Sequence, residues 1–107
     1  MRLAFISDVH SNLEALKQCL ACVDETGYDA LVCLGDTVGY GPNPNECLEI
    51  VRERATLCLA GNHDHAAIGY LDTSYFNEYA RQAITWTSSV LSSEHVEHLK
   101  SLEIIAE

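Results

Sequence analysis

The stretch ALVCLGD, residues 30–36, decides the fold of this chain. Its first five residues are apolar without interruption, which is typical of a strand buried in a parallel sheet. A Gly-Asp pair ends the run. The same arrangement occurs twice more: residues 2–6 precede Asp-Val-His at 8–10, and residues 56–60 precede Gly-Asn-His-Asp at 61–64. The sequence therefore predicts three short strands, each followed by a polar cluster.

The segments between these strands have the spacing of amphipathic helices. Ser11 begins a Ser-x-x-Glu capping pattern, which predicts that a helix starts there, and Gly27 ends it. Asn43 as a cap and Pro44 in the first turn predict a second helix. The residues expected to face the sheet are Leu13, Leu16, Leu20, Val23, Cys47, Leu48 and Val51.

Two more helices and a fourth strand are expected beyond the third polar cluster. Residues 61–65 read as a loop, and Ser74 or a neighbour opens the third helix. Ser93 is expected to cap a short fourth helix, and residues 102–106 to form a strand. The apolar side of the third helix is expected to carry Tyr75, Tyr79, Ala83 and Trp86.

This alternation of strands and helices predicts the α/β class, with a parallel sheet covered by helices on both faces. A length of 107 residues suits one domain with a modest core. Because no apolar run approaches the roughly 20 residues that span a bilayer and the start does not resemble a signal peptide, we expect no membrane partner and a cytoplasmic location.

Charge and cysteine content exclude several classes. The net charge of −10 repels phosphate backbones, so no nucleic-acid-binding surface is expected. The five cysteines, an odd number, argue against a disulfide framework, and we expect them to act as small buried hydrophobic residues. Cys19 and Cys22 form a lone C-x-x-C inside a helical pattern, which only weakly indicates zinc or redox chemistry.

The three polar clusters should meet at one edge of the sheet, because ligands of open α/β sheets bind beyond the carboxyl ends of the strands. Asp8, His10, Asp36 and Asn62 would then offer carboxylate, imidazole and amide ligands, a set that suits Mn²⁺, Fe or Zn²⁺ better than Ca²⁺. Taken singly, each of these residues could be a cap or turn residue. Together they predict a centre in which two metals about 3.5–4 Å apart clamp a phosphoryl group.

The motifs D-x-H, G-D and G-N-H-D, in this order and spacing, resemble the leading motif set of the calcineurin-like metallophosphoesterases. The segments DVHSNLEAL, CLGDTVGYGPNPNEC and AGNHDHAAIG are similar to the small bacterial and archaeal phosphodiesterase/phosphatase branch, most clearly over residues 1–69. The resemblance implies that residues 1–107 are the N-terminal βαβαβα half of a single domain, a four-layer α/β/β/α sandwich.

The resemblance also implies roles for the metal ligands. Asp8 and His10 would bind the first of two divalent ions, Asp36 would bridge both, and Asn62 would bind the second ion and the substrate phosphate. Mn²⁺ is the expected metal, with Fe, Zn²⁺ or Ni²⁺ as alternatives. The substrate would be a phosphomonoester or phosphodiester.

Two further roles concern the leaving group. His63 would contact the substrate beside the leaving oxygen, as general acid or transition-state stabiliser. Asp64 would orient the imidazole of His63 by pairing with it.

The family's later motifs, a lone histidine and a G-H-x-H segment, do not occur in this sequence. His65 could lie just outside the metal shell, whereas His95 and His98 are expected on a solvated helix face. The resemblance therefore implies a fragment that needs a second half, exposes an apolar sheet face and could form a homo-oligomer. A non-catalytic scaffold and an inactive fragment are the alternative readings.

Overall fold

A computed structural model describes residues 1–104, in which three short strands form a parallel sheet in the order β1-β2-β3. Leu3 of β1 pairs with Ala30 of β2, and Val32 of β2 pairs with Leu57 of β3. The α/β class is thus confirmed. The elements are β1 (Leu3–Ile6), α1 (Leu13–Thr26), β2 (Ala30–Cys33), α2 (Pro44–Arg54), β3 (Leu57–Cys58), α3 (Asn62–Ala67), α4 (Glu78–Val90) and α5 (Ser93–Ser101).

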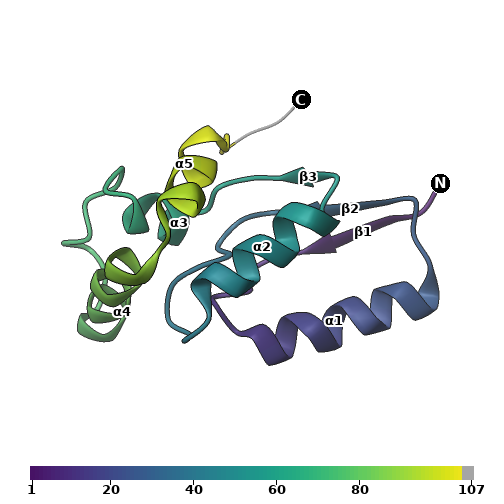
Figure 1. Ribbon diagram of the computed structural model, residues 1–107, viewed down its shortest axis with the longest axis horizontal. Coiled ribbons are helices and arrows are strands. Elements are labelled where there is room, and N and C mark those ends of the chain that lie inside the picture. Colours follow the sequence, from purple (N-terminus) through teal and green to yellow (C-terminus); the bar gives the residue numbers. More distant parts are fainter. Residues whose placement is uncertain (105–107) are drawn as a thin grey trace.

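Helices α1 and α2 both pack on the same face of the sheet, where they run beside the strands (Figure 1). The expectation that helices cover both faces is wrong for the described residues. The reason is topological: the strand order advances in one direction, so two right-handed crossovers place their helices on one side. The buried residues of this core are Leu16, Leu20, Leu31, Cys33, Cys47 and Val51.

The other face of the sheet is open in the part of the chain that the structure describes. Leu3 is 47% exposed, Phe5 57% and Leu57 41%. Phe5, Val32 and Leu57 are neighbours in register, so they form one row across the three strands. We refer to Leu3, Phe5, Val32 and Leu57 as the open face. An exposed apolar sheet face was expected from the sequence, and it is present.

The start of α1 differs by one residue from the prediction. Asn12, not Ser11, is the N-cap, and its side-chain oxygen accepts a hydrogen bond from the backbone N–H of Ala15 at 3.1 Å. The backbone of Ser11 instead joins the next loop, donating to the Thr37 carbonyl at 2.8 Å. Asn43 caps α2 as predicted, although its side chain donates to Glu46 rather than accepting from the helix backbone.

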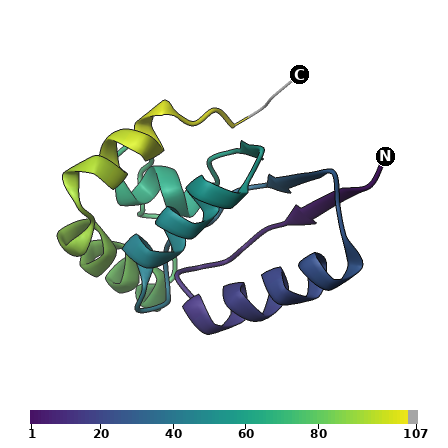
Figure 2. The same cartoon turned by 45° about the vertical axis from the view of Figure 1, so that its right-hand side comes forward.

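Helices α3, α4 and α5 gather beyond the carboxyl ends of the strands (Figure 2). The expected loop at residues 61–65 is wrong, because Asn62 already begins the six-residue helix α3. Ser92, rather than Ser93, caps α5. A second core joins these helices to α2, and its buried members are Val38, Leu48, Ala66, Ala67, Ile84 and Leu99.

The buried side of α4 was predicted incorrectly. Tyr75 precedes the helix and is 92% exposed, and Tyr79 is 80% exposed. Ala80, Ile84 and Thr87 lie inside instead. The predicted residues and the buried residues both recur every three or four positions, so the spacing alone fits either side of the helix. The smaller side chains of the buried set allow α4 to approach α2 and α3.

The strand expected at residues 102–106 is not found at residues 102–104, and residues 105 and 106 lie outside the described part. The carbonyl oxygen of Glu103 nevertheless accepts a hydrogen bond from Ala60 N–H at 2.8 Å, so the chain returns to the side of β3. Within residues 1–104, no helix has both the length and the apolar composition needed to cross a bilayer.

Candidate metal centre

Backbone hydrogen bonds join the loops that follow β1 and β2. The N–H groups of Asp8, His10 and Ser11 donate in turn to the carbonyl oxygens of Gly35, Asp36 and Thr37, at 3.1, 3.0 and 2.8 Å. The parallel pairing thus continues past the strand ends. The two loops lie side by side at the carboxyl edge of the sheet, as the sequence predicted.

Asp8, His10 and Asp36 form a cluster at this edge. Each offers one ligand atom, and these atoms all lie within 4.8 Å of one another. Asp8 is exposed, whereas His10 and Asp36 are partly buried, so the cluster opens to solvent on one side. Two carboxylates and an imidazole at this spacing can hold a divalent cation.

The orientation of His10 suits a metal ligand. Its Nδ1 lies 3.1 Å from the carbonyl oxygen of Val38, and because a carbonyl only accepts, Nδ1 carries the hydrogen. In the neutral ring Nε2 then has a free lone pair, and it faces Asp8 Oδ1 at 3.3 Å. A lone pair and a carboxylate oxygen repel unless a cation or a proton lies between them. The donor set therefore fits a metal ion.

The second oxygen of Asp8 accepts a hydrogen bond from the Ser7 hydroxyl at 2.6 Å. This bond holds the pKa of the Asp8 carboxyl below its usual value. Asp8 is therefore ionised at neutral pH, as a metal ligand must be.

Two glycines allow the loops after β2 and β3 to touch. A Cβ atom added to Gly35 would lie 2.6 Å from the backbone nitrogen of Gly61, and Gly35 has φ +116°. A Cβ on Gly61 would lie 2.5 Å from the backbone nitrogen of Asp36 and would collide with its carboxylate. Larger residues at either position would push apart the loops that carry Asp36 and Asn62.

Asp64 links these same loops, which is a different role from the predicted one. Its Oδ2 accepts from the N–H groups of Asp36 and Gly61, both at 2.9 Å, and its Oδ1 accepts from Val38 N–H at 3.0 Å. The expected pairing with the His63 imidazole is not among the hydrogen bonds of residues 1–104. Burial raises the pKa of Asp64 to about 6, although the N–H donors of Gly61 and Val38 oppose that rise.

Aromatic rings, rather than a carboxylate, surround the imidazole of His63. The centroid of its ring lies 4.8 Å from those of His10 and Phe76 and 5.0 Å from that of Tyr40. Its Nδ1 is buried without a hydrogen-bond partner among the described residues, and a Cβ on Gly39 would lie 2.7 Å from it. Burial lowers the pKa of His63, so the ring is neutral at pH 7.

The backbone places Asn62 and His63 next to the cluster. His63 N–H donates to Asp36 Oδ1 at 3.0 Å, and Asn62, the exposed first residue of α3, directly precedes it. His65 packs against Tyr70, with ring centroids 5.7 Å apart.

The two histidines of α5 lie far along the chain from these loops. His95 was expected on a solvated face, but it is buried, with Nδ1 2.7 Å from Asn45 Oδ1. His98 is partly buried, and burial lowers its pKa. These surroundings favour a structural role for both.

The loops that follow β1 and β2 contain five non-glycine residues with left-handed backbone. Their φ angles lie between +49° and +62°, a region that such residues seldom adopt. Clusters of this kind are typical of functional sites held by surrounding structure. The residues are Asp8, His10, Ser11, Asp36 and Tyr40.

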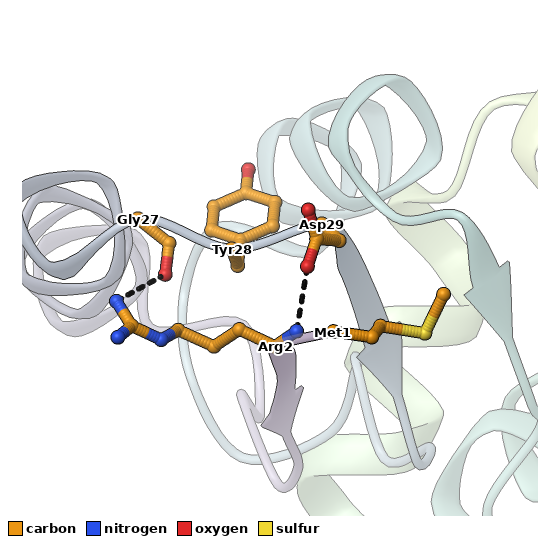
Figure 3. A pocket seen from close by; sticks show the side chains of 5 residues that line it. All are labelled: Met1, Arg2, Gly27, Tyr28 and Asp29. Atoms are coloured by element: carbon orange, nitrogen blue, oxygen red, sulfur yellow. Dashed lines mark hydrogen bonds between the residues drawn. The ribbon is translucent and has the colours of Figure 1, made fainter.

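A separate hollow lies near the N-terminus, at the opposite ends of the strands (Figure 3). Its polar groups bind one another: Arg2 N–H donates to the Asp29 carboxylate at 2.6 Å, and the Arg2 guanidinium donates to the Thr26 and Gly27 carbonyls. These hydrogen bonds pair the polar groups around the hollow with one another. The hollow therefore offers no ligand set comparable to the cluster of Asp8, His10 and Asp36. Its lining residues are Met1, Arg2, Gly27, Tyr28 and Asp29.

The family model described as calcineurin-like phosphoesterase matches residues 1–105. The chain belongs to the calcineurin-like phosphoesterase family. The resemblance identified from the motifs is thereby confirmed.

Known proteins of similar sequence and structure agree with this membership. The chain is 47% identical over 105 residues to an uncharacterised protein of Methanocaldococcus jannaschii, covering 98% of this chain and 43% of that protein. It is 26% identical over 103 residues to serine/threonine-protein phosphatase 1 of Salmonella typhimurium, covering 95% and 47%. A metallophosphoesterase from Sphaerobacter thermophilus has a TM-score of 0.78 and 48% identity, covering 95% and 41%. The chain thus spans less than half the length of these proteins.

Sequence reasoning missed several groups around the cluster of Asp8, His10 and Asp36. Tyr40 and Phe76 flank His63, and the Val38 carbonyl orients His10. The Gly-Tyr-Gly at 39–41 carried a weak signal, because its glycines indicate a turn, which places Tyr40 in the loop after β2. Phe76 lies outside the motifs and carried no such signal.

Proposed function

We propose that this chain provides the N-terminal part of a metal-dependent phosphoesterase that hydrolyses phosphomonoesters or phosphodiesters at a dinuclear centre. The observation that carries the proposal is the contact between His10 Nε2 and Asp8 Oδ1, with Asp36 beside them. Family membership supports phosphoester hydrolysis as the reaction class.

The proposed ligands follow the geometry of the loops. Asp8 and His10 would hold the first metal, Asp36 would reach both metals, and Asn62 would hold the second and contact the phosphate. When bound, two divalent ions supply positive charge for the phosphoryl oxygens and activate water. The mixed oxygen and nitrogen set makes Mn²⁺ our first choice, with Fe, Zn²⁺ and Ni²⁺ as alternatives.

His63 is the residue proposed to act at the leaving group. Its neutral ring has Nδ1 enclosed beside Gly39 without a hydrogen-bond partner in the described chain, so Nε2–H is the atom available to donate. Stacking against Tyr40 and Phe76 restricts the ring to this direction. Donation of this hydrogen to the leaving oxygen would stabilise the negative charge that develops there.

The remaining half of the domain is proposed to cover the open face and to add the missing histidine ligands. The apolar row of Phe5, Val32 and Leu57 supports this, as does the coverage of less than half of the relatives. A homo-oligomer formed through the same face is the alternative arrangement. A cytoplasmic location and the absence of a nucleic-acid partner remain part of the proposal.

The test compares two polypeptides: residues 1–107, and the chain extended through its downstream coding sequence. Both are assayed on bis-p-nitrophenyl phosphate and p-nitrophenyl phosphate with Mn²⁺. We expect the extended chain to hydrolyse at least one of them, to lose activity on chelation and to regain it with Mn²⁺. Activity that survives complete metal removal would refute the dinuclear mechanism.

Variants of the extended chain test the assigned residues. His63→Ala is expected to lower kcat by about 10²–10³-fold, the usual contribution of one hydrogen-bond donor placed at developing negative charge. His65→Ala is the matched control, since His65 lies on the same helix but packs against Tyr70. Equal activity of the two variants would rule out the role given to His63. Mn²⁺ binding without hydrolysis in the extended wild type would favour the scaffold reading instead.

A further inference from the structure

Two of the five cysteines face each other in the sheet beneath the metal centre. Cys33, the last residue of β2, pairs in register with Cys58, the last residue of β3. In-register residues of parallel strands point to the same face, and both side chains lie in the core between the sheet and α1 and α2. Both are free thiols in this structure.

The spacing of neighbouring strands brings this pair within disulfide range. Paired strands lie about 4.8 Å apart, inside the roughly 4.4–6.8 Å between Cα atoms that disulfides span. The other cysteines have no comparable arrangement. Cys47 is buried in the same core but projects from α2, and Cys19 and Cys22 are exposed on α1.

The environment of Cys33 also favours its reactive form. The neighbouring Cys58 side chain, the Gly35 backbone and the Thr37 hydroxyl, whose oxygen lies 3.7 Å from the Cys33 sulfur, lower the pKa of the Cys33 thiol, although burial opposes this shift. The pKa of Cys58 rises in return. Cys47 is the contrast, since burial and the negative charges of Glu46 and Glu14 raise its pKa to about 11.

We propose that Cys33 and Cys58 are a site of reversible oxidation that closes to a disulfide under the metal-binding loops. With hydrogen peroxide as oxidant, the Cys33 thiolate attacks one peroxide oxygen, the O–O bond breaks, and water leaves after protonation. The Cys58 sulfur then attacks the resulting sulfenic acid and releases a second water. Two thiols lose two electrons and two protons, and one peroxide becomes two waters.

Closing the bond has a structural consequence for the site. Disulfide Cβ atoms lie about 3.8 Å apart, roughly 1 Å closer than paired parallel strands place them. Asp36 follows Cys33 by three residues and Asn62 follows Cys58 by four, and their loops already touch at Gly35 and Gly61. Oxidation would therefore shift these loops relative to each other and weaken Mn²⁺ binding; this consequence rests on the proposed function, whereas the disulfide does not.

Thiol counting tests the disulfide on the 107-residue chain itself. The protein is treated with hydrogen peroxide, unfolded, labelled with N-ethylmaleimide and weighed by mass spectrometry. Wild type should take up three labels instead of five, regain five after dithiothreitol, and yield a peptide linking Cys33 to Cys58. Five labels after oxidation, irreversible oxygen addition, or a linkage to another cysteine would overturn the proposal.

Matched variants separate this pair from the other cysteines. Cys33→Ser and Cys58→Ser should each keep four labels, while Cys47→Ser should fall from four to two. If a variant does not fold, the wild-type peptide map still decides the question. A separate measurement of Mn²⁺ binding before and after oxidation tests the coupling: unchanged affinity would refute that consequence while leaving the disulfide established.

Discussion

Replacing Gly39 by alanine should displace the His63 imidazole, and Gly69 offers a matched control. Both glycines have left-handed backbone, with φ +96° and +80°. An alanine at either position should cost about 1–3 kcal/mol for that backbone alone. At Gly39 the new Cβ would also lie 2.7 Å from His63 Nδ1 and 3.2 Å from its Cβ, whereas nothing lies within 4 Å at Gly69.

The additional cost at Gly39 follows from how His63 is held. Because its Cβ is fixed to the backbone of α3 and its ring is packed against Tyr40 and Phe76, the side chain cannot simply rotate away. Forcing a methyl group into such a packed site costs about 1–3 kcal/mol. Gly39→Ala should therefore destabilise the fold by that amount more than Gly69→Ala.

Urea unfolding of the two variants measures this difference, and ¹⁵N NMR of labelled histidine reports the position and tautomer of His63. We expect the His63 signals to shift in Gly39→Ala and to stay unchanged in Gly69→Ala. Equal unfolding free energies, within about 0.5 kcal/mol, together with unchanged His63 signals in both variants, would refute the reasoning.

Three further predictions concern the cap, the buried carboxylate and the open face. Asn12→Ala should cost about 1 kcal/mol in urea unfolding and Asn43→Ala less, because only Asn12 accepts a hydrogen bond from its helix; the reverse order would contradict this assignment. Burial raises the pKa of Asp64 from 3.8 to about 6, so its stabilisation is complete below pH 3.8 and is lost as the pH rises through 6. The unfolding free energy of wild type minus that of Asp64→Asn should therefore fall by about 2.4 kcal/mol between pH 4 and pH 7, and a flat difference would exclude this titration. Phe5→Glu should reduce the fluorescence of the dye ANS and any self-association, whereas Tyr75→Glu, a change at an isolated exposed ring, should alter neither.

The strands and the metal cluster could be predicted because they depend on short-range pattern. Each apolar run ends in a polar motif, and parallel pairing brings these ends together whatever the details of the helices. Because Asp8, His10 and Asp36 lie just after the first two strands, the sequence predicted that their side chains would lie close together, as they do.

The role of Asp64 could not be read from the sequence. Adjacency to His63 suggested a pair, but consecutive residues of a helix point in directions about 100° apart, and the carboxylate turns toward the Asp36 and Gly61 backbone instead. Helices cover only one face of the sheet because of the strand order, and short-range sequence patterns do not specify that order. The exposed Tyr79 was misplaced because a helix with two possible apolar stripes needs its neighbours to choose between them.

The left-handed residues of the site loops carry a cost that matters for engineering. Each strained backbone position costs of order 1–3 kcal/mol, and glycine would relieve most of it. A screen that selects only for thermal stability would therefore favour glycine at Asp8, His10 or Asp36, and would remove the metal ligands while improving the fold. Stabilised libraries of this chain should hold these three positions constant and draw their gains from helix caps.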